Sequence, residues 1–268
     1  MSSLLIGISL KMYFDRRRTS QWCHAVADIA DTHPATRDGH VTVVVLPSFP
    51  YLVDALNIFA ETPVEVGGQN LYCSDQGAFT GEVSGAQLAE LGCGYVEVGH
   101  AERRRLFGED DALIAAKTAA AYRNRLIPIL CVGEIRRGAP AAAAEECLAQ
   151  LNSALAVAAD EATTGPLAVA YEPQWAIGAA EPASPEHITE VSVALRGHLG
   201  SMAQFAGSRV IYGGSAGPGL FTELKTGVDG LFLGRFAHDP AAVALILDET
   251  QADAHLTCAA VRPEGRRP

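Results

Sequence analysis

The segment LAVAYEPQWAIG, residues 167–178, places a short apolar run directly before a glutamate, Glu172. The run at 167–171 is nearly continuously apolar, as strands are in a parallel sheet that is covered on both faces. A helical pattern begins at Ser184, and Pro185 occupies a position that the first turn of a helix tolerates. This order of a buried strand followed by a helix predicts one β/α unit of a parallel sheet.

The same unit recurs along the rest of the chain. Apolar runs predict further strands at residues 4–9, 41–46, 64–68, 95–99, 126–132, 209–213 and 230–234. Helical patterns occupy residues 20–30, 51–60, 84–91, 111–123, 141–160, 217–225 and 240–247. Strands that start about every 30 residues suit right-handed βαβ units, which build either a closed barrel or an open doubly wound sheet. Eight units in 268 residues favour a single (β/α)8 barrel over residues 1–250, with a poorly ordered tail at 251–268.

Composition excludes several classes of protein. The 268 residues carry a net charge of −11, which argues against a general nucleic-acid binder because such a protein needs a basic surface. No apolar stretch approaches the ~18 residues of a membrane span, and the N-terminus lacks the pattern of a signal peptide. The six cysteines are scattered without metal-binding or redox spacing, which is typical of reduced thiols. We therefore expect a cytoplasmic protein without nucleic-acid or membrane partners and without a metal site.

Polar side chains follow several predicted strands, at the edge of a parallel barrel where reactive groups gather. Ser9 and Lys11 lie two residues apart at the end of the first strand, so both point toward the barrel mouth. A lysine there either meets an anion or extends to solvent, and Glu102 is a natural partner for it. The glycines at 213–214 and Gly234 let backbone N–H groups approach an anion, although tight turns also use glycine.

His100 and Glu172 are candidates for acid–base chemistry. His100 lies at a junction between strand and helix, where the helix N-terminus disfavours the imidazolium ion and lowers the histidine pKa. A neutral imidazole can donate a hydrogen bond or shuttle a proton, although a single histidine is more often structural. Glu172 follows its strand directly and is therefore available as a general base. The apolar loop 175–178 is typical either of a lid that excludes water or of a loop packed on a helix.

A set of short motifs resembles the triosephosphate isomerase family over about residues 6–248. The motifs are GQN (68–70), GAFTGEVS (77–84), GHAERR (99–104), FGE (107–109), LCVGE (130–134), YEPQWAIG (171–178) and YGGS (212–215). The resemblance implies a (β/α)8 barrel and an aldose–ketose phosphate isomerase that works through an enediolate. Proton transfer needs only a base, an acid and a stabiliser of the oxyanion, so no metal or organic cofactor is implied.

The resemblance also implies roles for single residues. Glu172 would be the base that moves a proton between adjacent carbons, and His100 the neutral electrophile and proton shuttle, as is known for triosephosphate isomerases. Lys11, held by Glu102, would stabilise the enediolate and offset the charge of the phosphate. Backbone N–H donors for the phosphate would come from Gly178, Ser215 and Gly234, and Glu134 would anchor Trp175 of the lid.

The resemblance further implies a homodimer. The loop at 77–84 matches the segment that enters the partner subunit in this family. Thr80 would then lie near the partner's Lys11, and Glu82 would pair with Arg103.

Five positions near the expected site depart from the family pattern. Ser9 replaces a longer asparagine, and Ala101 replaces a serine that contacts the resting glutamate. Arg235 replaces a phosphate-binding glycine, where it grips the phosphate with two N–H groups, turns outward or fills part of the pocket. The lid continues Ala179-Ala180-Glu181 instead of Thr-Gly-Lys, which restricts a hinge if residue 180 needs a positive φ. Phe232 replaces a smaller aliphatic residue.

Ser9 and Arg235 together suggest a substrate larger than a triose phosphate. The default expectation is still the interconversion of glyceraldehyde 3-phosphate and dihydroxyacetone phosphate, in glycolysis and gluconeogenesis. The first alternative keeps the mechanism and changes the substrate to a four-carbon ketose phosphate such as an erythrulose phosphate. The second is a non-catalytic sugar-phosphate-binding protein, which the presence of the base, the histidine and the lysine disfavours. An aldolase with a Schiff base on Lys11 is disfavoured because Glu102 would raise the lysine pKa.

Overall fold

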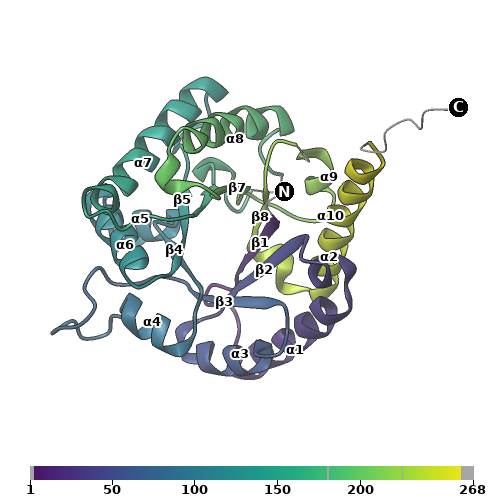
Figure 1. Ribbon diagram of the computed structural model, residues 1–268, viewed down its shortest axis with the longest axis horizontal. Helices are drawn as coiled ribbons and strands as arrows, with labels where there is room; N and C mark the ends of the chain where they lie inside the picture. The colour runs from purple at the N-terminus through teal and green to yellow at the C-terminus, as the bar shows by residue number, and fades with distance from the viewer. Residues whose placement is uncertain (1–2, 180, 225, 261–268) are drawn as a thin grey trace, which may run out of the picture.

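The computed structural model describes residues 3–179, 181–224 and 226–260, with side chains up to residue 251. Eight parallel strands close into a barrel in the order of the chain, and the helices surround it (Figure 1). Each strand lies within one residue of its predicted bounds, and the predicted single (β/α)8 barrel is confirmed. The strands are β1 (Leu4–Ser9), β2 (Val41–Leu46), β3 (Val64–Gly68), β4 (Tyr95–Val98), β5 (Ile127–Val132), β6 (Ala168–Tyr171), β7 (Arg209–Tyr212) and β8 (Gly230–Leu233).

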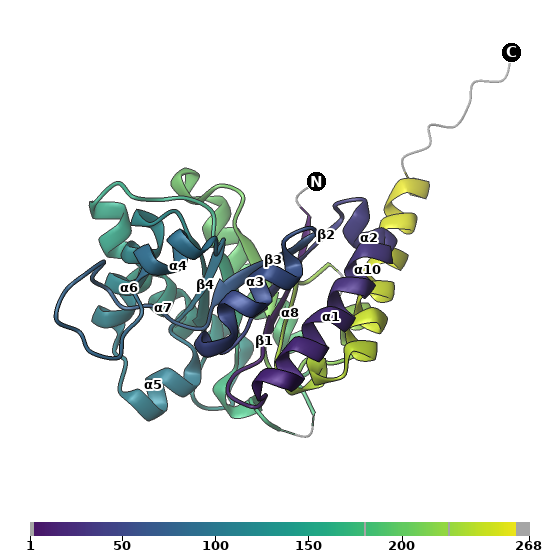
Figure 2. The same ribbon diagram turned by 90° about the horizontal axis from the view of Figure 1, so that it is seen from below.

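The helices pack their apolar sides on the outside of the barrel, and α1 and α10 lie next to each other on one flank (Figure 2). None of the helices in the described residues is both long and apolar enough to cross a membrane. The α-helices are α1 (Arg16–Thr32), α2 (Pro34–Arg37), α3 (Leu52–Phe59), α4 (Gly85–Leu91), α5 (Ala101–Phe107), α6 (Asp111–Arg123), α7 (Pro140–Asp160), α8 (Pro185–Gly200), α9 (Leu220–Leu224) and α10 (Pro240–Ala260).

Several helix boundaries differ from the prediction. Helix α1 begins at Arg16 rather than at residue 20, because the Asp15 carboxylate caps it by accepting the Arg18 N–H at 2.7 Å. Helix α5 was not predicted as a separate element. Helix α9 ends at Leu224, and residue 225 lies outside the described residues. Helix α10 continues to Ala260 instead of fading at 251, and residues 261–268 lie outside the described residues.

The interior of the barrel holds its own apolar cluster, separate from the larger layer between strands and helices. Its members are Leu5, Val44, Leu46, Tyr95, Ile129, Cys131, Ala168, Ala170, Ile211 and Phe232. A Cβ at Gly7 would lie only 2.6 Å from Cδ2 of Phe232. The large Phe232 side chain is therefore accommodated by a glycine on the neighbouring strand β1, in the floor below the catalytic edge.

Candidate active site

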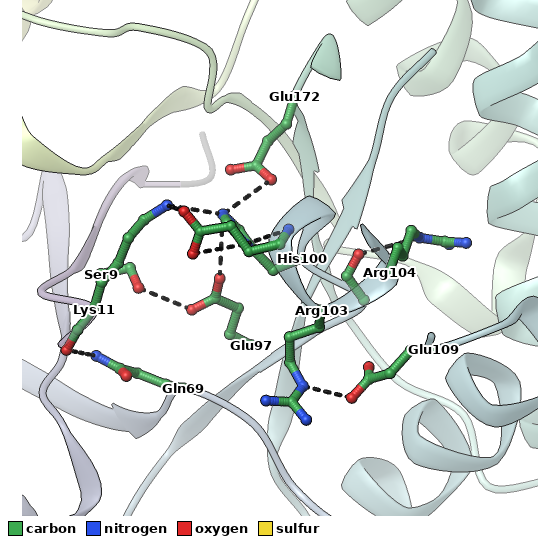
Figure 3. A network of polar contacts seen from close by, with 11 residues as sticks. Ser9, Lys11, Gln69, Glu97, His100, Arg103, Arg104, Glu109 and Glu172 are labelled. Carbon is green, nitrogen blue, oxygen red and sulfur yellow. Dashed lines mark hydrogen bonds and ion pairs between the residues drawn. The ribbon is translucent and has the colours of Figure 1, made fainter. Parts of the chain in front are cut away.

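Lys11, His100 and Glu172 converge at the carboxyl ends of β1, β4 and β6 (Figure 3). The Lys11 Nζ lies 3.3 Å from His100 Nε2, and Glu172 Oε2 lies 3.6 Å from the same nitrogen. Glu102 accepts a hydrogen bond from the Lys11 ammonium at 2.9 Å. The closed barrel thus gathers, around one imidazole nitrogen, groups that are separated by more than 70 residues in the sequence.

The imidazole of His100 presents a hydrogen-bond donor to the site. Its Nδ1 accepts the backbone N–H of Glu102 at 3.1 Å, so in the neutral ring the proton is on Nε2. Burial, reinforced by the charge of Lys11, lowers the pKa of His100 far below its usual value, so the ring stays neutral. The Nε2–H and the Lys11 ammonium are both donors and do not bond each other. An oxygen placed between them would accept from both, which suits an enediolate.

Lys11 is held in an unusual conformation. Its φ of 50° lies in the left-handed region, which costs a lysine free energy and persists only where the surroundings fix it. The Lys11 carbonyl accepts hydrogen bonds from Ser48 Oγ at 2.6 Å and Gln69 Nε2 at 3.0 Å. Burial opposes the ammonium charge, but the hydrogen bond to Glu102 and the nearby carboxylates outweigh it and raise the Lys11 pKa. A charged Lys11 is not a nucleophile, which disfavours Schiff-base chemistry.

Glu172 is a buried carboxyl with one oxygen free. The side chain is almost fully buried, and this burial, with the charge of Glu97, raises the pKa of Glu172 to about 8. Its Oε2 has no hydrogen-bond partner among the described residues, and Ala101 offers no hydroxyl. A Cβ at Gly213 would lie 2.7 Å from Glu172 Cγ, so only glycine leaves room for the carboxyl here. The free oxygen is suitably placed to take a proton from a bound substrate.

Glu97 is a functional candidate that the sequence analysis missed. It lies on β4, is only 3% exposed, and its Oε2 accepts a hydrogen bond from Ser9 Oγ at 3.0 Å. Its Oε1 lies 3.9 Å from His100 Nε2 (Figure 3). A signal was present, since a glutamate in the strand YVEV shares a face with Tyr95 by the period of two. That face is the barrel interior.

The expected phosphate-binding residues line one cavity of about 350 Å³ at the barrel mouth. A Cβ at Gly178 would lie 3.8 Å from an Arg235 guanidinium nitrogen, so the arginine reaches the lid from the opposite wall. The Ser215 hydroxyl donates to the carbonyls of Ala176 and Ala179, at 2.9 and 3.0 Å, and thereby ties down the loop. The cavity wall includes Lys11, Gly178, Gly213, Ser215, Gly234 and Arg235.

Glu134 connects the loop after β6 to the barrel. Trp175 donates its indole N–H to Glu134 Oε1 at 2.7 Å, and the Tyr171 hydroxyl donates to the same oxygen at 3.2 Å. The sequence analysis missed His187 of α8, whose Nε2 lies 3.2 Å from that oxygen and whose ring packs edge-on against Trp175. The proposed hinge residue Ala180 lies outside the described residues.

Two of the residues expected at a dimer interface, Thr80 and Glu82, lie away from this centre. Thr80 and Glu82 are exposed on the loop between β3 and α4, which projects from the barrel (Figure 1). Within the single chain Arg103 bonds Glu109, and the described residues include no ion pair between Arg103 and Glu82. The chain on its own therefore does not bring these two residues together.

The geometry defines an acid–base site for a small anionic substrate, and comparisons with known proteins place it in a family. A sequence model of triosephosphate isomerase matches residues 4–250. An L-erythrulose-1-phosphate isomerase of Pectobacterium atrosepticum is 55% identical over 92% of this chain and 95% of its own. A triosephosphate isomerase of Rhodopirellula baltica is 38% identical over 86% of this chain and 91% of its own. An L-erythrulose-1-phosphate isomerase of Mesorhizobium japonicum is 38% identical over 75% of this chain and 80% of its own.

The chain belongs to the triosephosphate isomerase family, and it is an isomerase. The predicted family and enzyme class are confirmed.

Proposed function

We propose that this isomerase acts on L-erythrulose 1-phosphate. The observation that carries the proposal is the 55% identity, over nearly the whole of both chains, with a protein of that activity. The triosephosphate isomerase of Rhodopirellula baltica is 38% identical to this chain. The default expectation of a triose phosphate therefore gives way to the four-carbon alternative, which Ser9 and Arg235 had already suggested.

The chemistry of this substrate defines the reaction. Carbon 1 carries the phosphate and carbon 2 the carbonyl, so an isomerase moves the carbonyl to carbon 3 through an enediolate across carbons 2 and 3. Glu172 takes the proton from carbon 3, while His100 Nε2–H and the Lys11 ammonium stabilise the negative oxygen on carbon 2. His100 then protonates that oxygen and receives the proton of the oxygen on carbon 3. Glu172 returns its proton to carbon 2, which leaves the carbonyl on carbon 3.

A triose phosphate would use the same three residues, so the substrate must be tested directly. We expect the purified protein to turn over L-erythrulose 1-phosphate with a kcat/KM at least about tenfold above that for glyceraldehyde 3-phosphate, which corresponds to ~1.4 kcal/mol. Glu172→Gln should lower kcat/KM by at least about 100-fold without unfolding the protein, because it removes the general base. A preference for the triose would refute the proposal, and normal turnover by Glu172→Gln would refute the mechanism. The non-catalytic alternative predicts binding of both sugars and turnover of neither.

We also infer that the protein is a homodimer in which the loop at 77–84 enters the partner subunit. Exposed apolar side chains support this, since Met12 is 92% exposed in the single chain and Phe79 is exposed on the loop itself. Analytical ultracentrifugation should give the mass of a dimer, and Phe79→Asp should shift it to that of a monomer. A monomeric wild-type protein would contradict the inference.

We also propose that the protein is cytoplasmic. Buried free thiols such as those of Cys23 and Cys131 support this location.

A further inference from the structure

The cavity at the barrel mouth lies above a buried layer of polar side chains. Gly178, Ser215 and Arg235 line the wide mouth, whereas Ser9 lies two residues before Lys11 on β1 and is buried. A substrate whose phosphate is at the mouth and whose reacting carbons contact His100 must therefore direct its other end toward the barrel interior. The phosphate-distal carbon of the substrate comes closest to the floor of the barrel.

That floor contains Glu97. Three groups surround His100 Nε2 within 4 Å: Lys11 Nζ at 3.3 Å, Glu172 Oε2 at 3.6 Å and Glu97 Oε1 at 3.9 Å (Figure 3). Any substrate oxygen that bonds His100 Nε2 is therefore within a few ångströms of Glu97. The carboxyl lies beneath the lining of the mouth cavity, and its closeness to His100 Nε2 places it next to the reacting oxygens.

Only one of the two carboxylate oxygens of Glu97 accepts a hydrogen bond from the described residues. Ser9 Oγ donates to Oε2, while Oε1 accepts no hydrogen bond from the described residues. Burying a carboxyl without full hydrogen bonding is unfavourable. An acceptor that lies this close to His100 Nε2 and has no donor among the described residues is a position for a donor on the substrate.

We propose that Glu97 and Ser9 form a subsite for the hydroxyl group that the substrate carries on the carbon beyond the enediolate. Ser9 orients the carboxyl through Oε2, and Oε1 accepts the hydrogen bond of the terminal hydroxymethyl group. Serine in place of the longer asparagine provides the room for this additional carbon. The inference rests on the proposed function, because a triose phosphate ends at the enediolate and has no such hydroxyl.

The subsite also predicts discrimination against the smaller sugar. A site built to bond a substrate hydroxyl rejects the analogue without it, because the buried acceptor is then left unpaired. The preference for the four-carbon substrate over glyceraldehyde 3-phosphate should therefore depend on Glu97. Glu97 is a specificity-determining residue in this proposal, and Glu172 remains the base.

The test compares two substrates that differ in one hydroxyl group. They are L-erythrulose 1-phosphate and the analogue in which its terminal hydroxymethyl group is a methyl group. The variants are Glu97→Val, which suits a strand between Val96 and Val98, the isosteric Glu97→Gln, and Ser9→Ala. The matched control is Glu65→Gln on β3, an exposed glutamate on a neighbouring strand. For each protein, the quantity measured is the ratio of the two kcat/KM values.

We expect the wild-type protein and Glu65→Gln to favour the hydroxylated substrate by about 10- to 100-fold, the range for a hydrogen bond to a charged group. Glu97→Val should bring the ratio near one, and Glu97→Gln and Ser9→Ala should lower it by smaller amounts. A ratio that is unchanged in all three variants would overturn the inference, even if their absolute rates fall. That result would leave the proposed function intact, because the wild-type protein still uses the tetrulose phosphate. A wild-type protein that prefers glyceraldehyde 3-phosphate would overturn both.

Discussion

The pH dependence of turnover is a direct consequence of how Glu172 is buried. The base must be ionised to accept a proton, and burial with the nearby charge of Glu97 raises its pKa to about 8. A raised pKa means that the active carboxylate form is lost as pH falls through that value. Each pH unit below the pKa reduces the ionised fraction tenfold, so kcat/KM at pH 6 should be roughly 100-fold below its plateau at high pH.

Replacing Glu97 tests the cause of this shift. Burial raises the pKa of Glu97 to about 7, so this carboxyl carries its negative charge only above that pH. There Glu97→Gln removes a charge close to the base, so the pKa of Glu172 should fall and the acid limb of the profile should move to lower pH. The assay is kcat/KM for L-erythrulose 1-phosphate from about pH 5 to 9 in constant ionic strength. The second ionisation of the substrate phosphate, with a pKa of about 6, adds a limb that is the same in both proteins. A wild-type profile that is flat down to this phosphate limb would refute the reasoning about burial.

Two further substitutions test the walls of the cavity. Arg235→Gly should raise KM about 3- to 10-fold with little change in kcat. The effect is modest because this arginine is exposed and solvent screens its contact with the phosphate. Steady-state kinetics measures KM, and an unchanged value would show that the side chain faces solvent. Gly213→Ala places a methyl group against Glu172 Cγ and should lower kcat by roughly 100-fold, because a displacement of ~1 Å misaligns the base. Thermal unfolding of the same sample checks that the Gly213→Ala protein is folded, and a normal kcat would mean that the carboxyl has room to move.

Much of the site could be predicted from the sequence because a parallel barrel brings the carboxyl ends of all strands to one edge. Lys11, His100 and Glu172 each follow an apolar run, and the closed order of the strands brings Lys11 Nζ and Glu172 Oε2 to 3.3 and 3.6 Å from His100 Nε2. The number and the direction of the strands are enough to predict that these three residues converge. The distances between their side-chain atoms could be obtained only from the structure.

The parts that were missed depend on contacts between distant segments. Glu97 alternates with Val96 and Val98, so its inward direction was readable, but its bond to Ser9 was not, since 88 residues separate them. The side chain of Arg235 had two possible directions, and only the position of Gly178 across the cavity shows which wall it reaches. Helix boundaries were missed where a capping side chain such as Asp15 extends the helix beyond the apolar pattern.

The charges of the site suggest that two of its unusual residues compensate each other. Glu97, Glu102 and Glu172 surround a single ammonium, that of Lys11, and an anionic substrate must still bind there. Arg235 adds a positive charge to the cavity wall where the family pattern has a glycine. If it offsets the carboxyl of Glu97, the rise in KM caused by Arg235→Gly should be smaller in a Glu97→Val background than in the wild-type protein. A double-mutant cycle on KM measures this coupling, and strictly additive effects would mean that the two residues act independently.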